Sequence, residues 1–380
     1  MQPLHVIGGV FLALALAGSA YAVAAAMLAG RLAGPPGEPW PPLPTITVLK
    51  PLCGAEPDLV ANLAGFLRQD YGAPVQVICG VQDPSDPGLE AVGAARAAQP
   101  GADLEIVVDS RIHGANRKVS NLINMTEKAR HELLVLSDSD IAVGPDYLAR
   151  IAAAAAAPGV GAVTCYYYGR AAAAGRWSQL AAMGVSYGFL PNVLVGVALG
   201  AARPCMGSTI ALKREVLDEI GGFAAFSDVL ADDYEIGRAV RARGYRVALP
   251  PFAVAHDCAD ASFAELVGHE LRWAVTVRMI DPLGHAGSIL THPLALALIG
   301  AALCGGASYA LAAICLALAA RAGLKWRLDR AVGRSSGPWR LLIARDLLTF
   351  AVFVGSFFAR AVYWRGARFG VSSGRKFFPA

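Results

Sequence analysis

Two aspartates, Asp138 and Asp140, follow the apolar run Leu133–Leu136 at a spacing that suits a bound cation. Carboxylates two positions apart at the end of a strand can both point toward one Mg²⁺ or Mn²⁺, which prefers one or two carboxylates together with substrate phosphates. A capped turn explains the same Asp-Ser-Asp sequence without any ligand. The pattern therefore makes this pair a candidate metal site, with a structural turn as the alternative.

A second acidic pair, Asp232 and Asp233, opens the helix predicted over residues 233–242. Acidic side chains at this position commonly cap a helix and interact favourably with its dipole. A carboxylate here can also act as a general base that takes the proton from an attacking hydroxyl group. The element alone favours the capping role, and a general base is the chemical alternative.

Cationic side chains suited to a diphosphate occur in two further segments. Arg272, within His269-Glu270-Leu271-Arg272-Trp273, can bind a diphosphate in a bidentate manner and neutralise a leaving group. Trp273 fits either a substrate contact or a core position. Lys118 lies in a loop predicted at 116–118, where it offers a further phosphate ligand, although a solvated basic turn is the default interpretation there.

The elements that must position these residues alternate between strand and helix. Strands are predicted by four short apolar runs, at residues 45–49, 75–81, 104–108 and 133–136. Periodic segments between them predict helices, so the order implies right-handed crossovers and an α/β fold with a mostly parallel central sheet. Ligands of such sheets bind beyond the carboxyl ends of the strands, which is where Asp83, Asp138 and Asp140 all fall. The sequence lacks the glycine fingerprints of dinucleotide-binding and P-loop proteins.

The apolar residues gather at the two ends of the chain. Hydrophobic residues make up 55% of the sequence and charged residues only 16%, against about 25% charged in ordinary soluble domains. Residues 1–30 are predicted to be a transmembrane anchor, because positions 6–30 carry no charge and are long enough to span the bilayer; a cleaved signal peptide is the alternative. Residues 31–43 are predicted to be a Pro-rich linker, and residues 44–285 have the composition of an ordinary soluble domain.

The C-terminal end is predicted to return to the membrane. Residues 286–320 are predicted to be a transmembrane or re-entrant helical hairpin that turns at Gly305-Gly306, with one long span as the alternative. The segment 321–345 carries seven basic residues and one acidic residue, so it is expected to stay cytoplasmic. The whole of 321–380 is interpreted as a basic segment with a shallow, membrane-associated helix at Leu347–Ala359.

Charge and cysteine content exclude other classes of protein. The net charge of +4 and the lack of a basic tract with interleaved aromatics argue against nucleic acid as a partner. The seven cysteines are scattered and form no Cys-x-x-Cys pair, which argues against a zinc site or a disulfide framework. The oligomeric state is not indicated by the sequence.

Taken in order, these segments resemble the inverting glycosyltransferases of the GT-A type, which use nucleotide-diphospho-sugar donors. More closely they resemble the ceramide glucosyltransferase-like family, which includes the bacterial hopanoid glycosyltransferases. The resemblance covers about residues 46–283 and rests on Val48-Leu49-Lys50-Pro51-Leu52, Gln82-Asp83 with Asp86-Pro87, Asn116-Arg117-Lys118-Val119-Ser120-Asn121-Leu122, Asp138-Ser139-Asp140, Gly207-Ser208, Gly221-Gly222-Phe223, Ala231-Asp232-Asp233-Tyr234 and Arg272-Trp273. It implies a GT-A fold for residues 44–285, with membrane helices at both ends.

The resemblance also implies a role for each matching residue. Asp233 would be the catalytic base that inverts the anomeric centre in a single displacement, and Asp140 would bind Mg²⁺ or Mn²⁺ on the diphosphate. Asp232 and His269 would be acceptor-side or accessory residues, although His269 departs from the Gln or Arg of the family motif. The donor would be bound by the remaining matches, Lys50, Asp83, Lys118, Asp138, Arg272 and Trp273.

The resemblance further implies a UDP-sugar donor, a membrane lipid acceptor and contact with the lipid bilayer. The segments Phe189–Val195 and His269–Trp273 look more like the hopanoid branch, which implies UDP-N-acetylglucosamine and a hopanoid polyol such as bacteriohopanetetrol. Ceramide with UDP-glucose is the alternative. This branch places the protein in the bacterial inner membrane with its catalytic domain facing the cytoplasm. The apolar stretch Phe189–Ala202 suits lipid entry and equally a buried helix.

Two other classes of protein were weighed against this interpretation. A processive polysaccharide synthase shares the motifs but needs a bundle of spanning helices, and the sequence offers one clear span. A non-catalytic protein that binds lipid or nucleotide on the same scaffold would be expected to lack one of the four acids, and all of them are present: Asp83, Asp138, Asp140 and Asp233.

Overall fold

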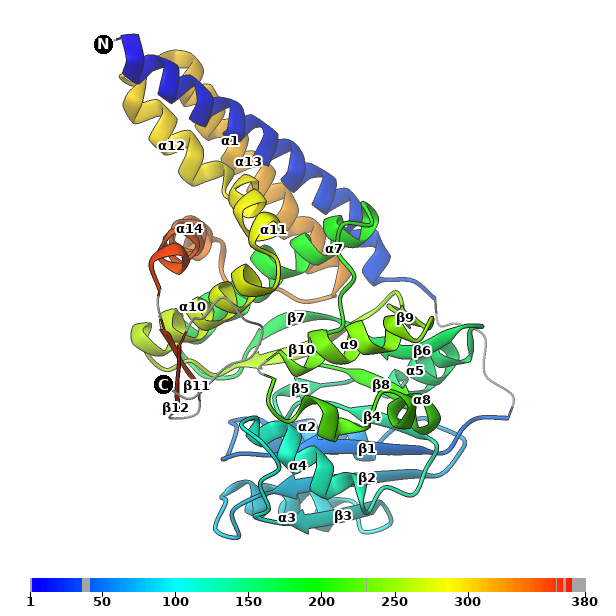
Figure 1. The fold of residues 1–380 in the computed structure, drawn as a ribbon. Helices are drawn as coiled ribbons and strands as arrows, with labels where there is room; N and C mark the ends of the chain where they lie inside the picture. The colour runs from blue at the N-terminus through cyan, green and yellow to red at the C-terminus, as the bar shows by residue number, and fades with distance from the viewer. Residues whose placement is uncertain (1, 36–41, 230, 360, 365–366, 371–380) are drawn as a thin grey trace.

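The computed structural model describes residues 2–35, 42–229, 231–359, 361–364 and 367–370. The predicted linker 31–43 is therefore described only in part, and residues 371–380 of the predicted C-terminal segment lie outside the described residues. An α/β domain forms the body of the protein, and a long helical bundle extends from it (Figure 1). The chain begins in this bundle with α1 (Gln2–Leu28) and the short turn η1 (Ala29–Leu32).

A seven-stranded sheet forms the centre of the α/β domain, in the order β3-β2-β1-β4-β8-β6-β9. Its strands, in chain order, are β1 (Ile46–Pro51), β2 (Val75–Val81), β3 (Asp103–Val108), β4 (Leu133–Leu136), β6 (Val160–Thr164), β8 (Ile210–Lys213) and β9 (Arg246–Ala248). All neighbours pair in parallel except β8, which runs antiparallel to both β4 and β6. The prediction of a mostly parallel central sheet is confirmed.

Helices cover both faces of this sheet. One face packs against α2 (Leu59–Leu67), α3 (Gly88–Ala98) and α5 (Tyr147–Ala156), and the other against α4 (Arg117–Thr126), α8 (Arg214–Glu219), η3 (Phe223–Phe226) and α9 (Asp232–Ala242). In β1, Val48 packs on the first face and Leu49 on the second, because successive side chains of a strand point in opposite directions. Strands buried on both faces are apolar at most positions, which explains the mostly apolar runs in the sequence.

A smaller sheet lies beside the acidic pair at the end of β4. It consists of β5 (Ile141–Ala142), β10 (Ala253–Cys258) and β7 (Tyr166–Ala171), with β10 in the middle. The backbone N–H of Asp257 on β10 donates to the carbonyl oxygen of Asp140 over 2.8 Å, which joins the two sheets at this point. Between this sheet and the bundle lie α6 (Arg176–Gly184), the π-helical turn η2 (Val185–Phe189), α7 (Leu190–Ala198) and α10 (Phe263–Ile280) (Figure 1).

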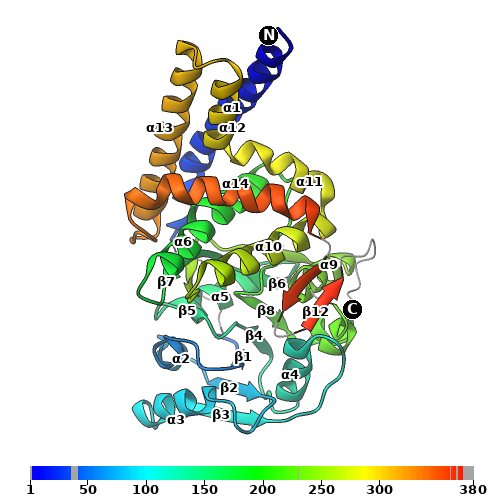
Figure 2. The same ribbon diagram turned by 90° about the vertical axis from the view of Figure 1, so that its left-hand side faces the viewer.

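The helical bundle consists of α1, α12 (Pro293–Leu303) and α13 (Ser308–Ala331). The preceding segment, α11 (Pro282–Gly287) with η4 (Ser288–Thr291), meets α12 at a bend of 70°. α12 and α13 form a helical hairpin whose turn contains Gly305 and Gly306, and both have the positive φ that favours glycine. η5 (Trp339–Leu341) leads into α14 (Leu342–Phe358), which runs across the bundle axis above α10 (Figure 2). β11 (Ala361–Trp364) and β12 (Ala367–Gly370) form an antiparallel pair.

Within the described residues, four helices are long and apolar enough to cross a membrane, or five if the bent pair α11–η4 and α12 counts as one span. The sequence predicted only one clear span. The difference arises because charged residues interrupt the apolar pattern after residue 320, yet α13 continues through them to Ala331. Two of these charges are buried in ion pairs, Arg321 with Asp346 and Lys325 with Asp329, so they are accommodated inside the protein. The four helical segments are Pro3–Leu32, Arg176–Ala198, Ser308–Ala331 and Trp339–Phe358.

Candidate active site

Lys118 and Asp232 approach Asp138 from the first turns of α4 and α9. Lys118 Nζ lies 2.6 Å from Asp138 Oδ1 and 3.8 Å from Asp232 Oδ2. Burial disfavours the charge on Lys118, but these two carboxylates outweigh it and raise the pKa of Lys118 above its ordinary value. The lysine therefore stays cationic and holds together two of the predicted site residues, which come from distant parts of the chain.

The predicted loop at 116–118 is wrong, because α4 begins there. Asn116 caps this helix by accepting the N–H of Val119 over 3.1 Å, and Lys118 lies in the first turn. The Lys118 side chain is only 12% exposed, so it is not part of a solvated basic turn. An N-cap asparagine followed by a helical pattern was the signal in the sequence that would have placed Lys118 correctly.

Asp233 is held by two backbone N–H groups at the start of α9. Its Oδ2 accepts the N–H of Gly207 over 3.0 Å, and its Oδ1 accepts the N–H of Tyr234 over 2.7 Å. Burial and the neighbouring charge of Asp232 raise the pKa of Asp233 to about 6, against the opposing effect of Lys118 and the two N–H groups. A carboxylate with this pKa is ionised at neutral pH yet basic enough to accept a proton, as a general base must. Neither aspartate occupies the N-cap position, which is Ala231.

Gly207 lies where these charged groups meet. A Cβ atom on this residue would be 3.3 Å from Lys118 Nζ, 3.4 Å from Asp138 Oδ2 and 3.5 Å from Asp233 Oδ2. The end of β4, the start of α4 and the start of α9 therefore meet at Gly207. Because glycine has no side chain, the space between the three charged groups stays open.

We expect Gly207→Ala to lower by about tenfold the kcat/KM for the nucleotide-sugar donor that the resemblance implies, because the added methyl group crowds charged side chains that must keep their positions. Steady-state kinetics with varied donor measure the effect. Gly93→Ala on α3 is the matched control, since a Cβ there would meet no atom within 4 Å. Unchanged kinetics for Gly207→Ala would show that the donor does not pass this point.

Lys50 does not lie open to a ligand, although it was predicted to bind the donor. Its side chain is fully buried, its ammonium group donates to the Asp138 carbonyl oxygen, and Nζ lies 4.1 Å from the centre of the Phe66 ring. Burial lowers the pKa of Lys50 to about 8, although Asp140 and Asp138 favour its charged form. Lys50 thus supports the backbone that carries the acidic pair.

Asp83 is exposed in the turn that follows β2. Its Oδ1 accepts the hydroxyl of Ser85 over 2.6 Å and the N–H of Ser85 over 2.8 Å, and these hydrogen bonds lower the pKa of Asp83. None of its hydrogen bonds within the described part of the chain reaches Asp138 or Asp140. The predicted contact of Asp83 with the uridine end of the donor therefore stays a prediction.

Sequence analysis missed His256, which β10 places beside Asp140. His256 Nδ1 lies 3.6 Å from Asp140 Oδ1. Burial disfavours the Asp140 carboxylate, but the charges of His256, Lys50 and Lys118 outweigh it and lower the pKa of Asp140 to about 2. The run Ala253–Cys258 has the pattern of a buried strand, and the adjacent His256-Asp257 pair within it was the only signal in the sequence.

The surroundings of Asp140 fit a divalent cation. Its Oδ1 is buried and has no hydrogen-bond partner among the residues that the structure describes, so it can still accept a ligand beside the neighbouring positive charges. Mg²⁺ or Mn²⁺ suits one carboxylate together with the phosphates of a substrate. No group of three or more His, Cys, Asp or Glu side chains in the described ranges could hold a metal. Asp140 would therefore hold the ion together with a donor diphosphate.

α10 brings aromatic groups to the same side of the site. The ring of Trp273 packs edge-on against His269, with centroids 4.5 Å apart, and lies 5.9 Å from the ring of His256. His269 Nδ1 lies 3.5 Å from Asp260 Oδ1. Trp273 and His269 thus extend the site from the acidic residues toward the bundle. Arg272 is half-buried on the same helix, and its role as a phosphate ligand stays a prediction.

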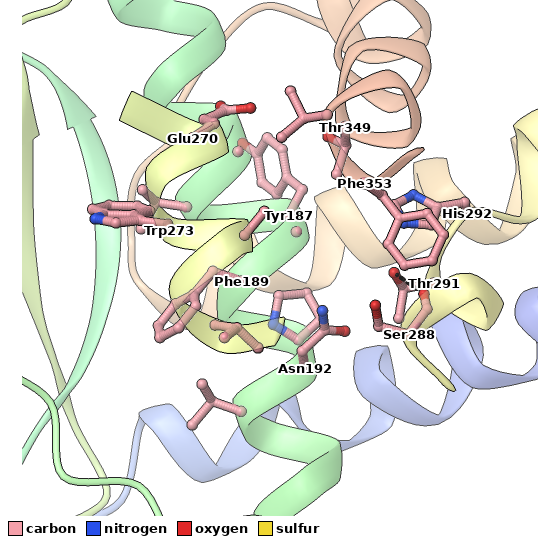
Figure 3. A pocket seen from close by; sticks show the side chains of 18 of the residues that line it. Tyr187, Phe189, Asn192, Glu270, Trp273, Ser288, Thr291, His292, Thr349 and Phe353 are labelled. Atoms are coloured by element: carbon pink, nitrogen blue, oxygen red, sulfur yellow. Dashed lines mark hydrogen bonds between the residues drawn. The ribbon is translucent and has the colours of Figure 1, made fainter. Parts of the chain in front are cut away.

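A cavity of about 550 Å³ begins beside His256 and Trp273 and extends to the apolar helices. Figure 3 shows Trp273 on one side of it and His292 on the other. The walls are mostly apolar and come from α1, η2, α7, α10, η4 and α14. The stretch Phe189–Ala202, for which the sequence allowed lipid entry or a buried helix, contributes Phe189, Val195 and Ala202 to these walls, among others.

The fold and the acidic residues at its strand ends define a GT-A-like glycosyltransferase. A mannosyltransferase from Pyrobaculum calidifontis, solved in complex with GDP-Man and Mn²⁺, has the same fold. It aligns with a TM-score of 0.52 at 23% sequence identity, covering 92% of this chain and 99% of that one. The predicted fold class is confirmed.

The chain belongs to Glycosyl transferase family 21, whose family model matches residues 10–377. Ceramide glucosyltransferase 1 of Caenorhabditis elegans is 28% identical over 239 residues, which are 62% of this chain and 50% of that protein. Ceramide glucosyltransferase 3 of the same organism is 25% identical over 234 residues, 61% of this chain and 50% of that protein. The chain thus spans about half the length of the curated relatives it matches. The resemblance to the ceramide glucosyltransferase-like family is confirmed.

Proposed function

We propose that the protein is a membrane-bound inverting glycosyltransferase that moves a sugar from a UDP-sugar to a hydroxyl group of a membrane lipid. The observation that carries this proposal is the cavity that runs from His256, the neighbour of Asp140, to the apolar helices. A lipid acceptor can keep its hydrocarbon part in such a cavity while its hydroxyl group reaches the site beside His256 and Trp273. The activity of the ceramide glucosyltransferase relatives supports the same acceptor class.

Asp233 acts as the base in this reaction. It takes the proton of the lipid hydroxyl as the oxygen attacks the anomeric carbon from the side opposite the diphosphate. The new C–O bond forms while the bond to the diphosphate breaks, so the configuration at the anomeric carbon inverts. Lys118 and Asp138 orient the donor, and Arg272 binds its diphosphate. A Mg²⁺ or Mn²⁺ ion at Asp140, when bound, neutralises charge on the leaving UDP.

Two pairs of substrates fit this proposal. UDP-N-acetylglucosamine with a hopanoid polyol such as bacteriohopanetetrol is favoured by the sequence pattern around Phe189–Val195 and His269–Trp273. UDP-glucose with ceramide is favoured by the relatives. The basic residues between α13 and α14, Arg334 and Arg340, support a cytoplasmic catalytic domain at the bacterial inner membrane.

Mass spectrometry of reaction products tests the proposal directly. The detergent-purified full chain is incubated with each UDP-sugar and each lipid in the presence of Mn²⁺, and glycolipid formation is followed for all four combinations. We expect a β-linked product from the α-linked donor with at least one combination. Binding of a UDP-sugar and a lipid without any product would instead favour the non-catalytic binding protein on the same scaffold.

A further inference from the structure

Four of the polar side chains that line the cavity have no part in the transfer reaction itself. They are Asn192 on α7, Ser288 and Thr291 in η4, and His292 at the bend before α12 (Figure 3). Leu290 and Val352 are among the apolar lining residues. Charged lining residues pair with one another, Arg321 with Asp346 and Arg345 with Glu270. A few placed polar groups in an apolar cavity fix the orientation and identity of a ligand, because leaving them unpaired is unfavourable.

Each of three side chains retains an unused hydrogen-bonding group. Ser288 donates its hydroxyl to the His285 carbonyl over 2.7 Å, and Thr291 donates to the Ser288 carbonyl over 2.8 Å. The lone pairs of both hydroxyl oxygens remain available as acceptors. Asn192 Oδ1 accepts the hydroxyl of Tyr21 over 3.0 Å, which leaves the amide N–H groups of Asn192 as donors without a partner in the described part of the chain.

His292 gives independent support for a ligand at this place. Its side chain is buried, with only 6% exposed, and its ring packs against Phe350 and Phe353 at centroid distances of 5.5 and 5.0 Å. Neither ring nitrogen has a hydrogen-bond partner among the residues described, and the ring lines the cavity. An imidazole offers one donor and one acceptor or two donors, so burial without a partner is unfavourable unless a ligand supplies one.

We propose that Asn192, Ser288, Thr291 and His292 form a polar subsite for a second polar group of the lipid acceptor, between its glycosylated hydroxyl and its hydrocarbon. This inference rests on the proposed function. The four side chains together offer donors and acceptors, so they fit a group that does both, a hydroxyl or a secondary amide. The ester groups of a diacylglycerol only accept, and would leave the acceptor lone pairs of Ser288 and Thr291 without a donor. Ceramides and polyol lipids carry the required chemistry, whereas diacylglycerols and simple long-chain alcohols do not.

Acceptor competition with variants of this subsite tests the inference. The parent, Ser288→Ala/Thr291→Val and Asn192→Leu are assayed with ceramide, bacteriohopanetetrol, diacylglycerol and hexadecanol. We expect the parent to prefer ceramide or the polyol over the last two by about tenfold or more, and the variants to lose this preference through a higher KM for the preferred lipid with little change in kcat. A response confined to ceramide identifies the amide as the recognised group, and a response confined to the polyol identifies a hydroxyl.

Thr126→Val is the matched control. Thr126 also donates its hydroxyl to a helix carbonyl, that of Leu122 over 2.7 Å, but lies on α4 away from the cavity. An unchanged acceptor preference in the variants, or an equal loss of kcat for all four lipids, overturns the subsite. Absence of transfer by the parent contradicts the proposed function instead. In that case, retention of tritiated ceramide and tritiated polyol by the purified parent and variants still decides whether the subsite exists.

Discussion

Asp233→Asn is expected to lower kcat by roughly 100- to 10,000-fold while KM for the UDP-sugar stays nearly unchanged. Asparagine has the same size, and its carbonyl oxygen can still accept one of the two N–H groups, that of Tyr234 or that of Gly207. It cannot take a proton from the lipid hydroxyl. Single-turnover assays with radiolabelled UDP-sugar measure the loss, and donor binding by the variant shows that the site remains folded. Equal transfer by variant and parent would remove Asp233 as the base.

The pH profile offers a second measurement on the same residue. Burial and Asp232 raise the pKa of Asp233 to about 6, and only the ionised carboxylate acts as a base, so kcat/KM should fall tenfold per pH unit below about pH 6. Asp232→Asn removes one cause of the raised pKa and should move this fall to lower pH. Asp218→Asn, on the exposed side of α8, should leave the profile unchanged. A profile that stays flat to pH 5 contradicts the assignment.

The sheet and the acidic pair could be predicted because their determinants are local. The four runs at 45–49, 75–81, 104–108 and 133–136 are mostly apolar, since most of their side chains pack on the two faces of the sheet. Asp138 and Asp140 follow directly after the end of the last of these runs, 133–136. In a parallel sheet that end is where ligands bind, so the sequence indicates both the element and the site.

The remaining parts of the site depend on contacts between distant segments. His256 meets Asp140 only because β10 pairs with β5, and nothing near either residue in the sequence indicates that pairing. The charge of Lys50 would suit a phosphate ligand, but its side chain is buried in the interior of the protein. The length of α13 could not be predicted for a similar reason, because the ion-pair partner of Arg321 is Asp346 on another helix. Periodicity shows which face of an element is apolar, and it does not show which partner pairs with a buried charge.

The predicted metal site at Asp140 can be tested in the parent protein. Removal of divalent cations by exhaustive EDTA treatment should abolish transfer, and added Mn²⁺ should restore it. The expectation follows from the low pKa of Asp140, about 2, which keeps this carboxylate ionised and ready for a cation across the working pH range. Transfer that survives the chelator would count against a metal at Asp140.

Asp140→Asn is expected to lower kcat/KM by roughly 100- to 1,000-fold and to weaken Mn²⁺ binding in the presence of UDP, because a neutral amide binds a hard cation less tightly than a carboxylate does. Electron paramagnetic resonance of bound Mn²⁺ measures the second effect without any catalysis. Asp146→Asn is the matched control, since Asp146 is an exposed carboxylate paired with Arg150 on α5. Because the substitution also removes the ion pair of Asp140 with His256, the melting temperature of the variant is measured together with its Mn²⁺ binding. Weak Mn²⁺ binding in a variant that unfolds at the parent's temperature therefore isolates the loss of the ligand from any loss of fold.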